Sequence, residues 1–251
     1  ITTFAGTKER YKPIKKETTA KKKTHPLKTI KTLCRNKYFI LITLAFAVIY
    51  TSLGLTGGSR IYYAKYVLGD EILNSTMTMF NYIPTILTIM LIPVFTKRFG
   101  KIKALFVGFL FYAAGLVLEI AGPVNLPMIY TGLVLQGIGH AALYSCLFAI
   151  VGDVVDYSEW KDGIREEGIT YSVTSFGQKI GTGLGTAALG WILAAGHYDG
   201  TAAVQSASAI FAIKGLFLYL PLVITVIVLI IWYLFMGIDK IYPTVRKELD
   251  E

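Results

Sequence analysis

Charge is scarce in this sequence, and acidic charge is the scarcest. Only 16% of the 251 residues are charged, against about 25% in an average soluble domain. Asp and Glu number 16, against 25 Lys and Arg. The two cysteines, Cys34 and Cys146, lie in a basic stretch and in an apolar run, and neither suggests a disulfide or a metal site. The first 37 residues also lack the apolar core of a signal peptide. This composition excludes an ordinary soluble domain.

Apolar residues, by contrast, make up 54% of the chain and gather in six long runs after residue 37. The runs cover about residues 38–66, 73–95, 104–121, 127–151, 169–195 and 209–236. Each is close to the roughly 20 residues that a helix needs to cross the hydrocarbon core of a bilayer. The sequence therefore predicts an all-α integral membrane protein with six transmembrane helices, in contact with the lipid bilayer.

Lysine and arginine are concentrated on one side of the predicted helices. Twelve of the 25 lie between Lys8 and Lys37, and nine more follow the second, fourth and sixth runs. The connections after the first, third and fifth runs hold none. Because short cytoplasmic loops carry the positive charge, we expect both ends of the segment in the cytoplasm, with 1–37 a basic loop and 237–251 a tail. A basic stretch beside a bilayer is typical of contact with anionic lipid, so we expect no nucleic-acid partner.

The fifth run carries a lysine at a depth that disfavours charge. Lys179 lies ten residues after Ile169, roughly 15 Å into the predicted helix, where a lysine costs on the order of 2.5–3.5 kcal/mol. Polar residues around it recur at helical spacing and share one face. They are Tyr171, Thr174, Ser175, Gln178, Lys179 and Thr182. A substrate or ion pathway explains this stripe, and a structural ion pair with another helix is the alternative.

The same run carries Gly177, Gly181 and Gly185 at four-residue spacing. Small residues at that spacing let a second helix approach closely. They predict a helix-packing surface.

Two other runs carry shorter polar stripes. The stripes are Gln136, His140 and Tyr144 in the fourth run, and Thr78, Asn81, Thr85 and Thr88 in the second. Either stripe alone could serve only hydrogen bonds to a neighbouring helix, but three striped helices in one chain favour a shared polar cavity. Arg60 and Lys65, near the outer end of the first run, either guard its mouth or extend to the membrane interface.

Acidic residues cluster after the fourth run. Asp153, Asp156 and Glu159 recur every third residue, so they fall near one face if the helix continues. Three neighbouring carboxylates repel one another unless cations pair with them, and Arg165 follows six residues after Glu159. The pattern indicates a charge-paired gate, closed by Arg165 or by basic groups of another helix. A solvated loop is the alternative.

The segment Asp153–Gly185, DVVDYSEWKDGIREEGITYSVTSFGQKIGTGLG, resembles the signature of the glycoside–pentoside–hexuronide:cation symporters, the melibiose permease-like family of the major facilitator superfamily. Tyr62–Asp70 (YYAKYVLGD) and Thr96–Lys103 (TKRFGKIK) are similar to further segments of that family. The resemblance covers most of residues 38–240. It implies that the six predicted spans, as two three-helix repeats, form the C-terminal half of a twelve-helix fold.

The resemblance also implies roles for particular residues. Lys179 would lie near the cation and sugar sites, with Thr174 and Ser175 on the sugar-facing side of its helix. Tyr144 would take the place of a sugar-contacting tryptophan, and Asp153, Asp156 and Arg165 would form the inner charge-paired gate. The acidic cation site of the family belongs to the N-terminal half. Since the chain begins at Ile1, we expect it to be a fragment that lacks that half, with no metal ligands of its own.

The sequence thus predicts a cation-coupled secondary symporter for a sugar or glycoside in the plasma membrane, working by alternating access. It would need no cofactor besides the co-transported Na⁺ or H⁺. One alternative is a transporter of the same fold for a non-sugar solute, such as a lysolipid or a sulfonated compound. A membrane-embedded enzyme that holds Mg²⁺ between Asp153 and Asp156 is less favoured, because it needs carboxylates from two or more helices.

Overall fold

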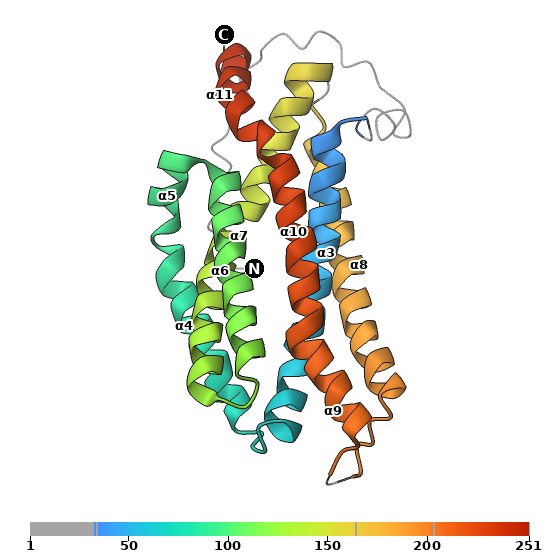
Figure 1. Cartoon of the computed structure of the whole chain (residues 1–251). Helices are drawn as coiled ribbons and strands as arrows, with labels where there is room; N and C mark the ends of the chain where they lie inside the picture. The colour runs from blue at the N-terminus through green and yellow to red at the C-terminus, as the bar shows by residue number, and fades with distance from the viewer. Residues whose placement is uncertain (1–32, 34, 164, 203, 251) are drawn as a thin grey trace, which may run out of the picture.

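The computed structural model describes residues 33, 35–163, 165–202 and 204–250, so the predicted basic loop 1–37 lies almost entirely outside the described residues. Every regular element in the described part of the chain is a helix. The elements are α3 (Lys37–Tyr66), α4 (Leu73–Ile89), α5 (Ile92–Phe99), α6 (Lys101–Ala121), α7 (Leu126–Asp162), α8 (Glu167–Ala195), α9 (Ala207–Lys214), η1 (Gly215–Tyr219), α10 (Leu220–Phe235) and α11 (Gly237–Asp250). They form an elongated bundle with most of the helix axes roughly along its length (Figure 1).

The structure differs from the predicted runs mainly in where the helices begin and end. The second run is divided into α4 and α5, which meet at an angle of 55°. The fourth run continues as α7 to Asp162 and ends at Gly163, whose φ of 64° suits glycine. Asp153, Asp156 and Glu159 therefore lie on a helix rather than in a loop. The last run is α9 and α10 joined by the π-helical turn η1, and the predicted tail contains α11.

Four of the described helices, α3, α6, α7 and the continuous α9–α10, are long and apolar enough to cross a membrane. The bent pair of α4 and α5 would make a fifth. At 29 residues α8 has the length of a span, but Lys179 and its polar stripe lower its hydropathy. The number six thus remains a prediction.

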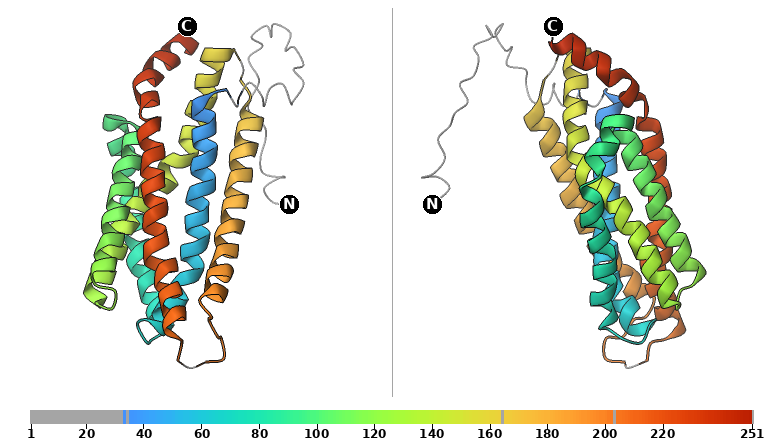
Figure 2. Two further views of the ribbon diagram at one scale, coloured as in Figure 1. Left: turned by 45° about the vertical axis from the view of Figure 1, so that its right-hand side comes forward. Right: turned by 90° about the vertical axis from the view of Figure 1, so that its left-hand side faces the viewer.

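The predicted glycine surface of α8 is confirmed, because it packs along α3. A methyl group at Gly181 would collide with the Ala47 carbonyl, and one at Gly185 with the Thr51 carbonyl. The two helices lie side by side over most of their length (Figure 2). This is the most extensive contact that α8 makes with another described helix.

The other helices build the remainder of the bundle around α7. Both α4 and α6 pack against α7, while α10 lies between α6 and α3 and joins the two groups. The larger apolar core fills the space between them, with Trp232 and Phe46 wholly buried. By contrast, α3 makes little contact with α4 or α7, and the polar pocket described below opens between these three helices.

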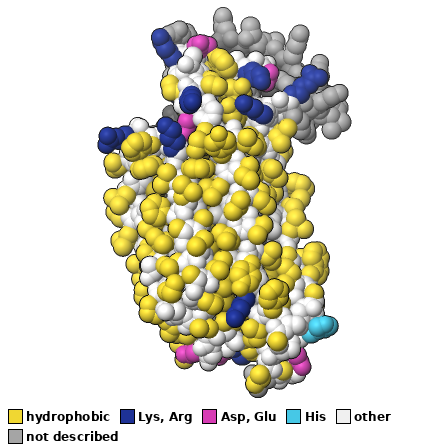
Figure 3. All heavy atoms as spheres, in the orientation of Figure 1, with side chains coloured by type: hydrophobic (Ala, Val, Ile, Leu, Met, Phe, Trp, Pro, Cys, Tyr) yellow, Lys and Arg dark blue, Asp and Glu magenta, His cyan; other side chains and the backbone are white. Residues whose placement is uncertain are grey.

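Apolar and charged side chains are separated along the bundle. The face shown in Figure 3 is covered mainly by hydrophobic side chains, and the dark blue Lys and Arg gather near the end that carries α11. We call this the gate end, defined by the start of α6, the last turns of α7 and α11. The amphipathic α11 packs across α7 there.

Candidate functional site

Most of the polar stripe of α8 is at least partly exposed, because only one face of this helix packs against α3. Thr174 and the glycines face α3, while Phe176 and Leu184 form an exposed apolar face. The stripe lies between these two faces. Tyr171, Lys179 and Thr182 are exposed, and Ser175 and Gln178 are half-buried. In the described chain the stripe therefore lies open along one side of the bundle.

Thr174 is the predicted site residue that does not reach this open side. It has no exposed surface, and its hydroxyl donates to the carbonyl oxygens of Thr170 and Tyr171 in its own helix, at 3.1 and 3.0 Å. Tyr171, Ser175 and Lys179 line a shallow hollow of about 410 Å³, together with Ser172 and Phe176. None of the ion pairs among the described residues involves Lys179, the cation of this hollow.

A deeper polar pocket of about 240 Å³ opens between α3, α4 and α7. Its lining is Leu53, Thr56, Gly57 and Arg60 from α3, Asn74, Thr78, Asn81 and Tyr82 from α4, and His140 and Tyr144 from α7. The sequence predicts one cavity shared by three striped helices; in the structure α4 and α7 contribute to this pocket together with α3, whereas the stripe of α8 lines the separate hollow. We call it the Arg60 pocket.

Hydrogen bonds fix several groups of the Arg60 pocket. Arg60 Nη1 donates to Thr78 Oγ1 at 3.1 Å, and His140 Nδ1 lies 3.3 Å from Asn81 Oδ1. Asn81 Nδ2 also donates to the Leu133 carbonyl at 3.2 Å, which ties α4 to α7. Tyr144 is 45% exposed and lies at the open side of the pocket. The lining thus offers a cation, hydroxyls, two amides and three aromatic rings, the groups that bind the hydroxyls and ring faces of a small polar solute.

Two predicted stripe residues face neighbouring helices instead. Gln136 Nε2 donates to Glu119 Oε1 of α6 at 2.7 Å. Thr85 donates to its own helix and to the Gly137 carbonyl of α7, at 2.8 and 3.0 Å. These residues join helices and line no part of the pocket.

Sequence reasoning missed two charged groups near the pocket. Glu119 has no exposed surface, and its Oε2 atom is buried without a hydrogen-bond partner. Arg60 was assigned only to a mouth or an interface, yet it lies in the pocket with its Nε buried and unpartnered. Glu119 belongs to no polar stripe in the third apolar run, so periodicity did not single it out. Its depth of burial depends on the register of α6 against α7.

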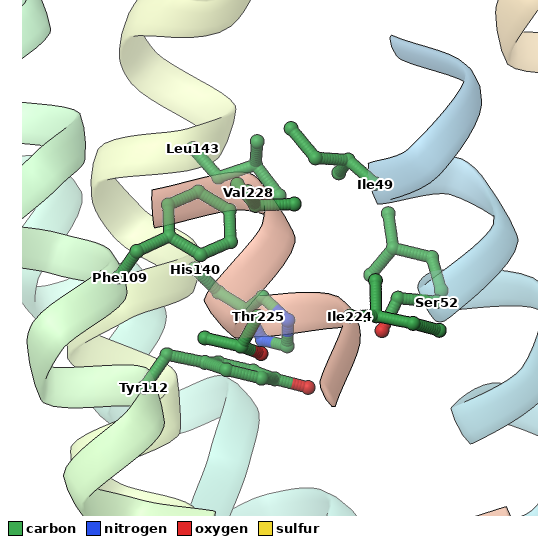
Figure 4. A pocket seen from close by; sticks show the side chains of 10 residues that line it. Ile49, Ser52, Phe109, Tyr112, His140, Leu143, Ile224, Thr225 and Val228 are labelled. Carbon is green, nitrogen blue, oxygen red and sulfur yellow. The ribbon is translucent and has the colours of Figure 1, made fainter. Parts of the chain in front are cut away.

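A second, much smaller cavity of about 20 Å³ lies behind His140. Figure 4 shows Tyr112, His140 and Thr225 gathered on one side of it, with Ile49 and Val228 among the apolar walls. The rings of Tyr112 and His140 are 5.0 Å apart. His140 borders both cavities and is therefore the boundary between the Arg60 pocket and the apolar core.

The acidic cluster at the gate end is closely paired. Arg165 bridges Asp156 at 3.1 Å and Glu159 at 2.5 Å, as the sequence pattern suggested. Asp153 pairs instead with Lys101 of α6, with Nζ–O distances of 2.6 and 2.9 Å. Lys101 had been read only as part of a basic loop. The cluster therefore links α6, the last turns of α7 and the segment before α8.

The C-terminal helix adds further partners to this cluster. Tyr242 donates to Asp156 Oδ2 at 2.9 Å, and Arg246 lies 3.5 Å from the same oxygen. Asp239 accepts from the backbone N–H of Lys103 at 3.3 Å, and its burial raises the pKa of its carboxyl. Hydrogen bonds and charge from Glu159 and Glu167 raise the pKa of Arg165, which keeps the guanidinium charged.

The chain belongs to the MFS/sugar transport protein family, whose profile matches residues 1–240. It is 32% identical to an isoprimeverose transporter of Lactiplantibacillus pentosus, over 99% of this chain and 51% of that protein. It is 26% identical to a glucuronide carrier protein homolog of Escherichia coli, over 88% of this chain and 49% of that protein. A candidate 2,3-dihydroxypropane-1-sulfonate exporter of Salmonella typhimurium is 29% identical over 98% of this chain and 54% of its own length.

The chain spans about half the length of these curated relatives. The family and the relatives' names point to transporters, not to enzymes. Together with the apolar helices, they identify the chain as a multi-pass membrane protein.

Proposed function

We propose that this chain forms one wall of a cation-coupled secondary symporter, which carries a sugar or glycoside across the plasma membrane by alternating access. The observation that supports it best is the Arg60 pocket, because it places a cation, an amide and aromatic rings within an apolar bundle. Charged and polar groups inside a membrane are costly, and where they occur they commonly mark a substrate or ion pathway. The relatives described as carriers of isoprimeverose and of glucuronides support the sugar class.

The wall requires a second six-helix half opposite the open side of α7 and α8. The exposed polar stripe of α8 and the exposed ring of Tyr144 are unsuited to lipid, and the matched relatives are about twice as long as the chain. In this proposal the solute binds between the two halves near the midplane. The coupling cation, Na⁺ or H⁺, binds with it, and no resident cofactor takes part.

The charge cluster serves as the inner gate in this proposal, with both ends of the segment in the cytoplasm. Its ion pairs hold α6, α7 and α11 together at one end of the wall. Intact pairs would keep the cytoplasmic end closed, and their separation would open it. Because a gate of this kind has two alternative arrangements, its pairs must be strong enough to close and weak enough to part.

An acidic solute, such as a sulfonated compound, is the second candidate. Arg60 and Lys179 lie on the open side, while the described linings of the pocket and of the α8 hollow contain no Asp or Glu. The sulfonate named for one relative agrees with that charge. A guanidinium binds carboxylate or sulfonate oxygens in a two-pronged geometry.

Uptake by the full-length protein in proteoliposomes tests the proposal, with labelled isoprimeverose, a glucuronide and 2,3-dihydroxypropane-1-sulfonate as three probes. We expect Na⁺- or H⁺-driven accumulation of one of the two sugars. In that case Lys179→Ala should reduce uptake at least about tenfold, a loss of roughly 1.4 kcal/mol, while Lys214→Ala in α9 serves as the matched control. Accumulation of the sulfonate alone would replace the first candidate by the second. Full uptake by the Lys179→Ala protein would remove Lys179 from the pathway.

A further inference from the structure

Glu119 is a carboxyl group in an environment that suits the neutral acid. It projects from α6 toward α7 beside Gly132, where an added methyl group would meet its side chain. One carboxyl oxygen accepts from Gln136 at 2.7 Å, and the other is buried with no partner. A carboxylate buried with a single neutral donor is costly, whereas a neutral acid is far less so.

Arg60 is the cation whose charge acts on Glu119, and it is also incompletely satisfied. Its Nη1 donates to Thr78 on the pocket side, while its Nε is buried without a partner. Its charge acts on Glu119 electrostatically. Even so, no ion pair among the described residues joins the two side chains. The structure thus holds a separated acid and cation, each with an unused polar atom: Arg60 lines the pocket, and Glu119 is fully buried outside its lining.

We propose that Glu119 is a proton-binding site that controls Arg60. With the proton bound, Glu119 is neutral, and Arg60 stays on Thr78 with its charge available to solute in the pocket. When the proton leaves, the carboxylate attracts Arg60 into an ion pair, and the guanidinium is withdrawn from the pocket. The proposal rests on the proposed function for its consequence in transport, but the proton site itself does not depend on which solute is carried.

The sign of the coupling follows from this exchange of partners. Protonation of Glu119 leaves Arg60 free, so protons and solute should favour one another's binding. Linkage makes this effect reciprocal, with a typical factor of roughly 5 to 150 between coupled sites. Solute should therefore bind more tightly at low pH and more weakly as pH rises through the ionisation of Glu119.

Other titratable groups surround this pair and must be separated from it. Electrostatic neighbours of Glu119 or Arg60 are Tyr63 from α3, Tyr112 from α6, and His140 and Tyr144 from α7, with Tyr219 of η1 beside Tyr63. Tyrosines ordinarily titrate near pH 10, and histidine near pH 6.5. His140 is consequently the one rival in this set for an effect close to neutral pH.

Infrared titration of the purified full-length protein tests the proton site without any solute. We expect a protonated-carboxyl band near neutral pH that is absent from Glu119→Gln and retained in His140→Gln. The glutamine at 119 can still accept from Gln136 Nε2, so it preserves the α6–α7 bond. In Arg60→Gln the band should persist to higher pH, because the cation that favours the carboxylate is gone. Identical spectra for wild type and Glu119→Gln would overturn the proposal.

Exchange of labelled isoprimeverose in proteoliposomes tests the coupling between about pH 6 and about pH 9. We expect the apparent affinity of the wild type to fall with rising pH, by a factor within the range above. Glu119→Gln should keep exchange and lose this dependence, while His140→Gln should retain it. Loss of the dependence in His140→Gln but not in Glu119→Gln would overturn the proposal. If the wild type carries no isoprimeverose, the sugar assignment fails, and the infrared result still decides the proton site.

Discussion

The gate end and the Arg60 pocket use the same kinds of charged residue in opposite ways. At the gate end, Asp153 and Asp156 are nearly buried and each meets at least one cation. At the pocket, Arg60 donates to a hydroxyl, and the nearby buried Glu119 accepts from an amide; no ion pair among the described residues involves either side chain. Paired charges close a structure, while unpaired charges in a pocket remain available to a ligand. The comparison therefore separates groups that hold the wall together from groups that act on its contents.

Breaking the most buried gate pair should have the largest effect on stability. Asp153→Asn leaves Lys101 without its carboxylate, at a site where the Asp153 side chain is 8% exposed. We expect a loss of about 2–4 kcal/mol, near the cost of removing one partner of a buried pair. Thermal unfolding of the full-length protein in detergent measures it, and the double variant Asp153→Asn, Lys101→Met should recover part of the loss. An unchanged unfolding temperature would contradict the structural role.

Asp156→Asn should act more locally, on the C-terminal helix. It weakens the contacts of Asp156 with Arg165, Tyr242 and Arg246, two of which belong to α11. We expect about 1–2 kcal/mol of lost stability and faster hydrogen exchange over α11, with α3 as the internal reference. Unchanged exchange over Gly237–Asp250 would show that α11 is held by its apolar face alone.

Glu159→Gln should have a small effect, although its bond to Arg165 is short at 2.5 Å. Arg165 is about half exposed and keeps both Asp156 and Glu167 as partners. Exposed pairs contribute about 0–1 kcal/mol, so the unfolding temperature should shift little and the shift should shrink in high salt. A loss as large as that of Asp153→Asn would mean that the cluster acts as one cooperative unit.

Arg60→Gln should have the smallest effect on stability and a large one on solute. Its hydrogen bond to Thr78 can be kept by the amide, so we expect the free energy of unfolding to change by less than about 1 kcal/mol. Loss of the cation should nevertheless weaken binding of an acidic solute at least about tenfold. Strong destabilisation with unaltered solute binding would show that Arg60 stabilises the fold, as the gate charges do, and does not act on solute.

Periodicity predicted which residues share a helix face, and this part of the account was sound. Apolar runs located most helix ends to within a few residues, apart from the bend between α4 and α5 and the end of α7, which extends to Asp162. The glycines of α8 predicted a helix-packing surface, which in the structure lies against α3. The stripes that carry Asn81, His140 and Tyr144 meet in one pocket, but the third stripe, on α8, does not join them. These features depend on local spacing, which the sequence displays directly.

Periodicity could not predict which neighbour each face meets. Thr174 shares a broad arc with Lys179, yet it faces α3, while Gln136 turns to Glu119. The partner of Asp153 is Lys101, 52 positions away on another helix. Such pairings depend on the register between helices and on long-range packing, which no spacing within a single run contains.

The central claim is that the open side of α7 and α8 lines a solute pathway, and thiol labelling of the full-length protein tests it most directly. In a background where Cys34 and Cys146 are serine, Tyr144→Cys should react with a water-soluble maleimide, and transported solute should protect it. Leu110→Cys, exposed on α6, is the control and should remain unlabelled if that face meets lipid. Labelling of Tyr144→Cys with solute protection is the predicted result. An unlabelled Tyr144→Cys, or labelling that solute leaves unchanged, would contradict the account.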